Sequence, residues 1–189
     1  MTTRDDTDDL DDLDAELLAE LVDSLAAAPP SASLKDRLMK SIESEGRFGE
    51  RFAERMAVIT DLARDKAKEL LDAIDDAARW VEGGLLGVNL FHIDGGPRVA
   101  GAIVGFVRMA PGAVFPEHTH VGHETVLVIQ GGFIDSSGAV HRAGEEVNMA
   151  AGSTHSFTAA PGPDLVYLGV VRDGFDIGEA HFGPDSPDA

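Results

Sequence analysis

Two histidines and a glutamate stand close together in the segment GAVFPEHTHVGHETVLVIQG, which runs from Gly112 to Gly131. One residue separates His118 from His120, so on a β-strand their imidazoles point to the same face and converge. Glu124 shares that face if the strand continues, or it comes from the next strand after a turn. Two imidazoles with a carboxylate suit zinc, iron, manganese or nickel better than calcium, which prefers oxygen ligands. The spacing therefore predicts a site for one divalent metal ion.

A fourth ligand is expected from a strand that is distant in sequence, and His155 in AGSTHSF is the best candidate. His123 adjoins Glu124 with the opposite side-chain direction, so we expect it outside the coordination sphere, where it could donate a hydrogen bond to a ligand carboxylate. Glu117 is expected to be an exposed strand residue. The remaining histidines are expected at the surface or at strand ends: His92, His141 and His181.

The segment from Gly112 to Gly131 resembles the first motif of the cupin superfamily, whose members are small jelly-roll barrels with a three-histidine, one-glutamate metal site. Every fixed position of that motif is matched. The second cupin motif is matched at Gly144, Gly152 and His155, whereas Ala150 replaces its proline and Ala159 its asparagine. Neither departure falls at a ligand position, so the resemblance implies a metal held by His118, His120, Glu124 and His155.

A longer stretch, roughly residues 29–172, resembles the ChrR-type anti-sigma factors. The likeness is carried by HTHVGHETVLVIQGGFIDSSGAVHRAGE, by LLDAIDDAARW upstream of it, and by PPSASLKDRLMKSI near the N-terminus. In that group the first half holds a sigma factor inactive, and the metal-bearing cupin half responds to an oxidative signal. Group members also carry a zinc site of His-x-x-x-Cys-x-x-Cys and another histidine, which this chain lacks because it has no cysteine and no histidine before His92.

Composition narrows the range of partners. The 189 residues include 34 acids and 15 bases, a net charge of −19, which argues against direct nucleic-acid binding and suits a partner with a basic surface. The absence of cysteine excludes disulfides and thiolate ligands. No apolar run is long enough to cross a membrane, and the acidic start MTTRDDTDDLDD is unlike a basic targeting peptide, so we expect a cytoplasmic protein.

The chain divides into four expected regions: an acidic, disordered tail over 1–12, a helical interaction region over 13–82, a cupin β-barrel over 83–182 and a flexible tail over 183–189. All seven histidines and 19 of the 21 glycines follow residue 82, which favours turn-rich β structure there. Strands are expected at 88–93, 102–109, 114–120, 125–129, 147–149 and 165–171. Helices are expected at 13–25, from 33 to 42 after a Ser33 cap, and from 48 to 80 with a break across 63–68. The predicted fold class is mainly β with an α-helical N-terminal region.

Strand alternation also predicts the surroundings of the metal. Counting from the expected ligands places Val114, Val126, Val128 and Phe157 beside it, all of them apolar. No lysine or arginine falls on those stretches, which argues against an anionic substrate. Arg108 and Tyr167, on other strands, are the polar residues that could point inward.

Three functions remain open. The favoured one is a ChrR-like regulator of transcription, whose helical half contacts a protein partner such as a sigma factor while the cupin half senses. The first alternative is a metal-dependent, dioxygenase-like cupin enzyme, although the apolar inner residues weigh against an enzyme. The second is a metal-stabilised cupin without sensing or catalysis. Each of these functions requires one divalent metal, with zinc favoured over iron, manganese or nickel. None of them requires nucleic acid or a membrane. The chain could also form a homodimer.

Overall fold

The computed structural model describes residues 31–37 and 46–186. The chain forms two compact units, Met1–Ile42 and Glu43–Ala189. In the first unit a helix begins at Leu34, and the carbonyl oxygen of Ser33 accepts its first helical bond from the Arg37 N–H at 3.0 Å. The helix expected at 13–25, the rest of the one expected to reach 42 and the acidic tail lie outside the described residues.

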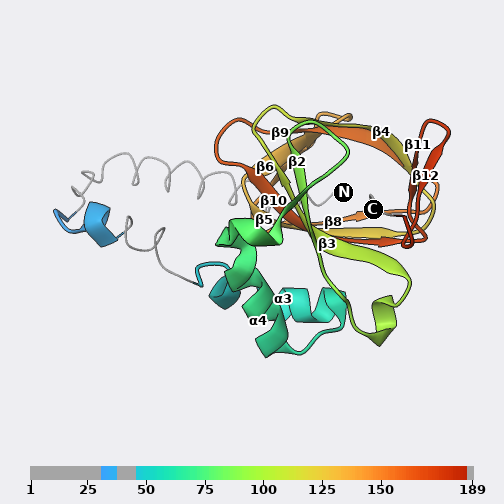
Figure 1. The fold of residues 1–189 in the computed structure, drawn as a ribbon. Coiled ribbons are helices and arrows are strands. Elements are labelled where there is room, and N and C mark those ends of the chain that lie inside the picture. The colour runs from blue at the N-terminus through green and yellow to red at the C-terminus, as the bar shows by residue number, and fades with distance from the viewer. Residues whose placement is uncertain (1–30, 38–45, 187–189) are drawn as a thin grey trace, which may run out of the picture. The chain divides into compact units, whose positions relative to one another are not determined.

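Two antiparallel sheets of six strands each form the larger unit. The first sheet has the order β1 (Val81–Glu82), β2 (Val88–His92), β3 (Ala102–Met109), β10 (Leu165–Arg172), β5 (Glu124–Gln130) and β8 (Glu146–Met149). The second has the order β12 (Ala180–Phe182), β11 (Phe175–Ile177), β4 (Val114–His120), β9 (Thr154–Ala159), β6 (Gly132–Asp135) and β7 (Val140–Arg142). Figure 1 shows the two sheets facing each other, as in a jelly roll. The predicted fold class is confirmed.

Two helices, α3 (Gly49–Thr60) and α4 (Arg64–Asp72), cover the outer face of the first sheet (Figure 1). Short 3-10 turns follow at Ala73–Asp75 and Ala77–Arg79, and a third lies at Pro97–Val99. The expected break is earlier than 63–68, because α3 ends at Thr60 and the left-handed φ of 56° at the following residue, Asp61, stops the helix. The polar run after it belongs to α4, which buries Ala67, Leu70 and Leu71 and exposes its charged side.

Buried apolar residues form two clusters, one on each face of the first sheet. The outer cluster joins Phe52 and Met56 of α3 to strand residues that include Phe106 and Leu168. The inner cluster lies between the two sheets and includes Val128 and Tyr167. Strand β10 is buried on both faces because helices cover one side and the second sheet the other. The division at residues 82 and 83 stays a prediction, but α3 and α4 share one core with the first sheet.

The strands at 102–109 and 114–120 have the expected bounds, and the other predicted strands differ by one residue at one or both ends. Sequence patterns missed six short or polar strands: β1, β6, β7, β9, β11 and β12. Within the part of the chain that the structure describes, no helix is long and apolar enough to span a lipid bilayer.

Candidate metal centre

Strands from both sheets bring the four predicted ligands together. His118 and His120 lie near the end of β4, and His155 on β9 is the register partner of His118. Glu124 arrives from the opposite sheet, because β4 ends at His120 and Glu124 is the first residue of β5 after a turn. The four side chains each offer a donor atom, and these atoms all lie within 4.8 Å of one another, so the cluster could hold a metal ion.

Short contacts orient all four candidate ligands. The Nε2 atoms of His120 and His155 are 3.0 Å apart, and His120 Nε2 lies 3.5 Å from a carboxylate oxygen of Glu124. The Nδ1 atom of His118 lies 2.9 Å from the carbonyl oxygen of Pro116, which can only accept a hydrogen bond. His118 therefore carries its proton on Nδ1 and keeps a lone pair on Nε2. An oriented imidazole with a free Nε2 is the usual form of a metal-ligating histidine.

Burial favours the uncharged form of each of the four groups when no cation is bound. It lowers the pKa of the His118 imidazole, and it lowers the pKa values of His120 and His155 to about 4, with the neighbouring histidines adding to the effect. Burial also raises the pKa of the Glu124 carboxyl to about 7. The imidazole lone pairs are thus available at neutral pH, and a bound cation would stabilise the ionised carboxylate.

The residues fit a metal ion in one further respect. The Nε2 atoms of His120 and His155 meet at 3.0 Å, so when both neutral rings carry their protons on Nδ1, two lone pairs face each other without a proton between them. Their Nδ1 atoms are also buried without a hydrogen-bond partner among the described residues. A cation coordinated by the two Nε2 atoms would fix both protons on Nδ1 and would replace the unfavourable contact between the two lone pairs.

One expectation about the surroundings is wrong. Val114 is 56% exposed, whereas alternation from His118 had placed it beside the metal. The reason is a β-bulge, because Phe115 pairs with Phe157 and His118 with His155, so β4 holds one more residue than β9 between these pairs. The extra residue reverses the side-chain direction, and Phe115 points inward in place of Val114.

A cavity of about 150 Å³ lies beside the candidate centre and reaches His118, His120 and Glu124. Phe157 lines it as expected, whereas Val126 and Val128 are buried between the sheets without lining it. Phe115, Phe175 and Phe182 were not anticipated as lining residues. The only sequence signal for the last two is the weak alternation of FDIGEAHF, which forms the β11–β12 hairpin.

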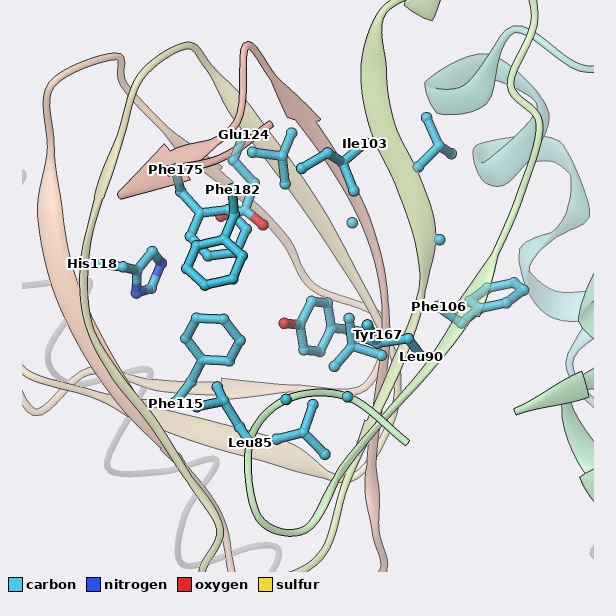
Figure 2. A pocket seen from close by; sticks show the side chains of 18 of the residues that line it. Leu85, Leu90, Ile103, Phe106, Phe115, His118, Glu124, Tyr167, Phe175 and Phe182 are labelled. Atoms are coloured by element: carbon cyan, nitrogen blue, oxygen red, sulfur yellow. The ribbon is translucent and has the colours of Figure 1, made fainter. Parts of the chain in front are cut away.

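Of the two polar candidates, only one points inward. Tyr167 lines the cavity (Figure 2). Arg108 instead lies on the outer face, where it donates to the Ile74 carbonyl oxygen at 2.6 Å and stacks 4.1 Å from the centroid of the Trp80 ring.

The remaining histidines lie outside the ligand cluster. His123 and His181 are exposed, as is Glu117, and His92 is an exposed strand-end residue at the edge of the cavity. His141 packs on the Phe133 ring, with its two nitrogens 3.6 Å and 3.4 Å from carboxylate oxygens of Asp135 and Glu145.

The double sheet and the three-histidine, one-glutamate cluster are those of a cupin. The family model of the ChrR cupin-like domain matches residues 71–171, just over half of the chain. The chain therefore belongs to the ChrR cupin-like family. No curated protein sequence matches it.

Several solved structures are similar to this chain. A chain of the crystal structure of Rhodobacter sphaeroides SigE in complex with the anti-sigma ChrR is 22% identical, with a TM-score of 0.49, over 82% of this chain and 75% of that chain. An acetylacetone dioxygenase from Acinetobacter johnsonii is 15% identical, with a TM-score of 0.48, over 57% of this chain and 81% of that chain. An RmlC-like cupin protein from Ralstonia eutropha is 26% identical, with a TM-score of 0.43, over 51% of this chain and 65% of that chain.

Proposed function

We propose that the chain is a metal-binding regulator of the ChrR type, whose helical half contacts a sigma factor while the cupin half senses a signal. The observation that carries this proposal is membership of the ChrR cupin-like family over residues 71–171. The partner class comes from ChrR, which is an anti-sigma factor bound to SigE in its crystal structure. A net charge of −19 supports a protein partner with a basic surface and not nucleic acid.

The packing of the larger unit supports communication between the helices and the cavity. On β3, Val104 and Phe106 belong to the cluster that buries α3 and α4, and Ile103 and Val107 have the opposite side-chain direction. The cavity is lined by residues of both sets. A single strand thus separates the cavity from the helices. A change of contacts inside the barrel would shift a strand against which the helices pack directly.

The proposed cofactor is one divalent metal held by His118, His120, Glu124 and His155, with zinc favoured and iron, manganese or nickel as alternatives. The support is the donor set, since three imidazoles and one carboxylate complete the four-ligand shell that zinc prefers. When bound, zinc would supply a Lewis acid and a cross-link between the two sheets. The helical half would fold without the second zinc site of the anti-sigma group, because the chain has no cysteine.

Metal analysis of protein purified without affinity nickel tests the cofactor. We expect about one metal ion per chain, and strong loss of metal in His155→Ala. His123→Ala is the matched control, because His123 is exposed and should leave the metal content unchanged. Full metal retention in His155→Ala would show that the fourth ligand is assigned wrongly.

Binding assays with each sigma factor of the host test the partner. We expect the full-length, metal-loaded chain to form a stoichiometric complex with one of them and to inhibit transcription by that sigma factor in vitro. Sizing of the free chain in the same experiment reports whether it forms a homodimer. Failure to bind any sigma factor would refute the proposal. A complex that persists unchanged after the metal is removed would indicate that the metal has a purely structural role.

A second candidate, a dioxygenase-like enzyme, is supported by one observation. The cavity reaches three of the four donor residues, so a substrate could lie next to the metal. Oxygen consumption by the iron-loaded protein that is lost in His120→Ala would favour the enzyme. Turnover that persists in this variant, or no turnover at all, would count against it.

A further inference from the structure

The cavity beside the candidate centre is lined mainly by apolar side chains from both sheets, including the β11–β12 hairpin at the edge of the second sheet. Leu90, Ile103 and Val171 come from the first sheet, Phe115 from the second, and Phe175 and Phe182 from the β11–β12 hairpin. Figure 2 shows the side chains of Leu90, Ile103, Phe115, Phe175 and Phe182 around the space between His118 and Tyr167. A cavity of about 150 Å³ is large enough for a molecule the size of benzene.

Tyr167 is the one polar side chain of the cavity outside the candidate metal ligands that is buried and unpaired. Its exposed fraction is 5%, and its hydroxyl has no hydrogen-bond partner within residues 31–37 and 46–186. Figure 2 shows the hydroxyl oxygen pointing into the open space. Burial raises the pKa of this phenol well above its usual value, so the hydroxyl stays protonated. Because no group of the described chain accepts from this hydroxyl, its acceptor has to come from a molecule inside the cavity.

Gly169 keeps the space between Tyr167 and Glu124 open. It lies two residues from Tyr167 on β10, and a Cβ atom built there would lie 3.6 Å from Tyr167 Cε2 and 3.7 Å from Glu124 Oε1. Its φ is not in the left-handed region, so neither the backbone nor a close contact requires glycine. The consequence of glycine here is room beside the tyrosine and the candidate metal ligand.

The charge of the lining limits what can occupy the cavity. The described residues that line it include no lysine or arginine, and Glu124 is the one carboxylate among them. An anionic ligand would therefore lose its hydration without gaining a cationic side chain, and the charge of a bound metal ion would already be offset in part by the ionised Glu124.

From these observations, we propose that the cavity binds a compact, neutral and largely apolar molecule with one oxygen acceptor, which takes the hydrogen bond of the Tyr167 hydroxyl. The cavity volume corresponds to about six to eight non-hydrogen atoms. This inference rests on the proposed regulatory function in one respect, since it names the class of ligand that the sensing half would take. Binding itself is a property of the free chain and is tested without a partner.

The test uses the full-length, zinc-loaded protein and three probes of similar size: cyclohexanone, methylcyclohexane and cyclohexanecarboxylate. Tyr167 is the single tyrosine of the chain, so NMR of protein labelled with ¹³C-tyrosine observes this residue alone. We expect cyclohexanone to shift the tyrosine signals saturably. Methylcyclohexane should bind about fivefold more weakly, which is the effect of one neutral hydrogen bond, and the carboxylate should bind more weakly than the ketone.

Two variants test the assigned roles, with binding followed at isoleucine methyl signals, which include Ile103. Tyr167→Phe should weaken the binding of cyclohexanone about fivefold and leave the affinity for methylcyclohexane unchanged. Gly169→Ala should weaken the binding of both probes, because the added methyl group occupies the space beside Tyr167. Val114→Ala is the control, since Val114 is exposed on β4 next to the inward-facing Phe115. An unchanged unfolding midpoint shows that each variant is folded.

Three outcomes would overturn the proposal: no binding of cyclohexanone at millimolar concentration, carboxylate binding as tight as ketone binding, or an unchanged ketone affinity in Tyr167→Phe. These failures are distinct from failure of the proposed function. A chain that binds the ketone but no sigma factor would refute the regulator and keep the cavity assignment. A chain that binds a sigma factor but no ketone would refute the cavity assignment and keep the regulator.

Discussion

Met56 offers a direct test of whether the helices and the first sheet form one cooperative unit. Its side chain is fully buried in the cluster that joins α3 and α4 to the sheet. Met56→Ala removes three side-chain atoms from this core, and such truncations cost roughly 2–5 kcal/mol when the cavity does not collapse. We therefore expect the free energy of unfolding to fall by about 3 kcal/mol, or the Tm by roughly 6–12 °C for a chain of this length.

Urea unfolding with two spectroscopic probes measures this effect. Trp80, the single tryptophan, lies between helices and sheet, because its ring N–H donates to the Ile74 carbonyl oxygen at 2.9 Å and its ring packs edge-on against Phe91. Far-ultraviolet circular dichroism reports on the sheets as well. The metal must be saturating throughout, since its dissociation would otherwise add to the apparent change.

Val58→Ala is the matched control on the same helix. Val58 is 65% exposed, so its truncation should change the free energy of unfolding by less than about 0.5 kcal/mol. The reasoning fails if Met56→Ala lowers only an early tryptophan transition and leaves the sheet transition in place. The helices would then unfold separately, and the suggested path from the cavity through β3 would lose its support.

Three further predictions concern the metal, the bulge and a helix–loop contact. Burial raises the pKa of the Glu124 carboxyl to about 7, so metal binding must displace its proton at lower pH; affinity measured by chelator competition should fall about tenfold per pH unit from pH 7 to 5. Phe115→Ala should destabilise the protein by about 1–2 kcal/mol in urea unfolding, whereas Val114→Ala should cost less than about 0.5 kcal/mol. Gly96→Ala should lower the Tm sharply, because its Cβ atom would overlap the carbonyl oxygen of Asp61 at the end of α3.

Each of these has a clear contrary result. In Glu124→Gln the dependence of metal affinity on pH between 5 and 7 should disappear, and its persistence would show that another group carries the proton. Equal losses of unfolding free energy in Phe115→Ala and Val114→Ala would contradict the side-chain directions that the bulge assigns. A Gly96→Ala protein with an unchanged Tm would show that the loop moves freely away from α3.

Local patterns predicted the parts of this protein that depend on neighbours in the chain. The strands at 102–109 and 114–120 follow from alternation, and the helical stripe through Phe52 and Met56 follows from a period of 3.6 residues. Short strands such as β6 and β11 were not predicted, because three or four residues are too few to show an alternation of apolar and polar side chains. The same local regularity selected the four candidate ligands, since their types and spacing are visible in the sequence.

What the sequence could not decide depends on pairing between distant strands. Whether Glu124 continues β4 or starts a new strand is settled by its place in the opposite sheet. The extra residue in β4 turns Val114 outward and Phe115 inward, which only the register with β9 reveals. Tyr167 faces the cavity and Arg108 the helices, because the two faces of one sheet are covered by different elements. Alternation gives the side-chain direction relative to neighbours, but the tertiary pairing decides which face is the inside.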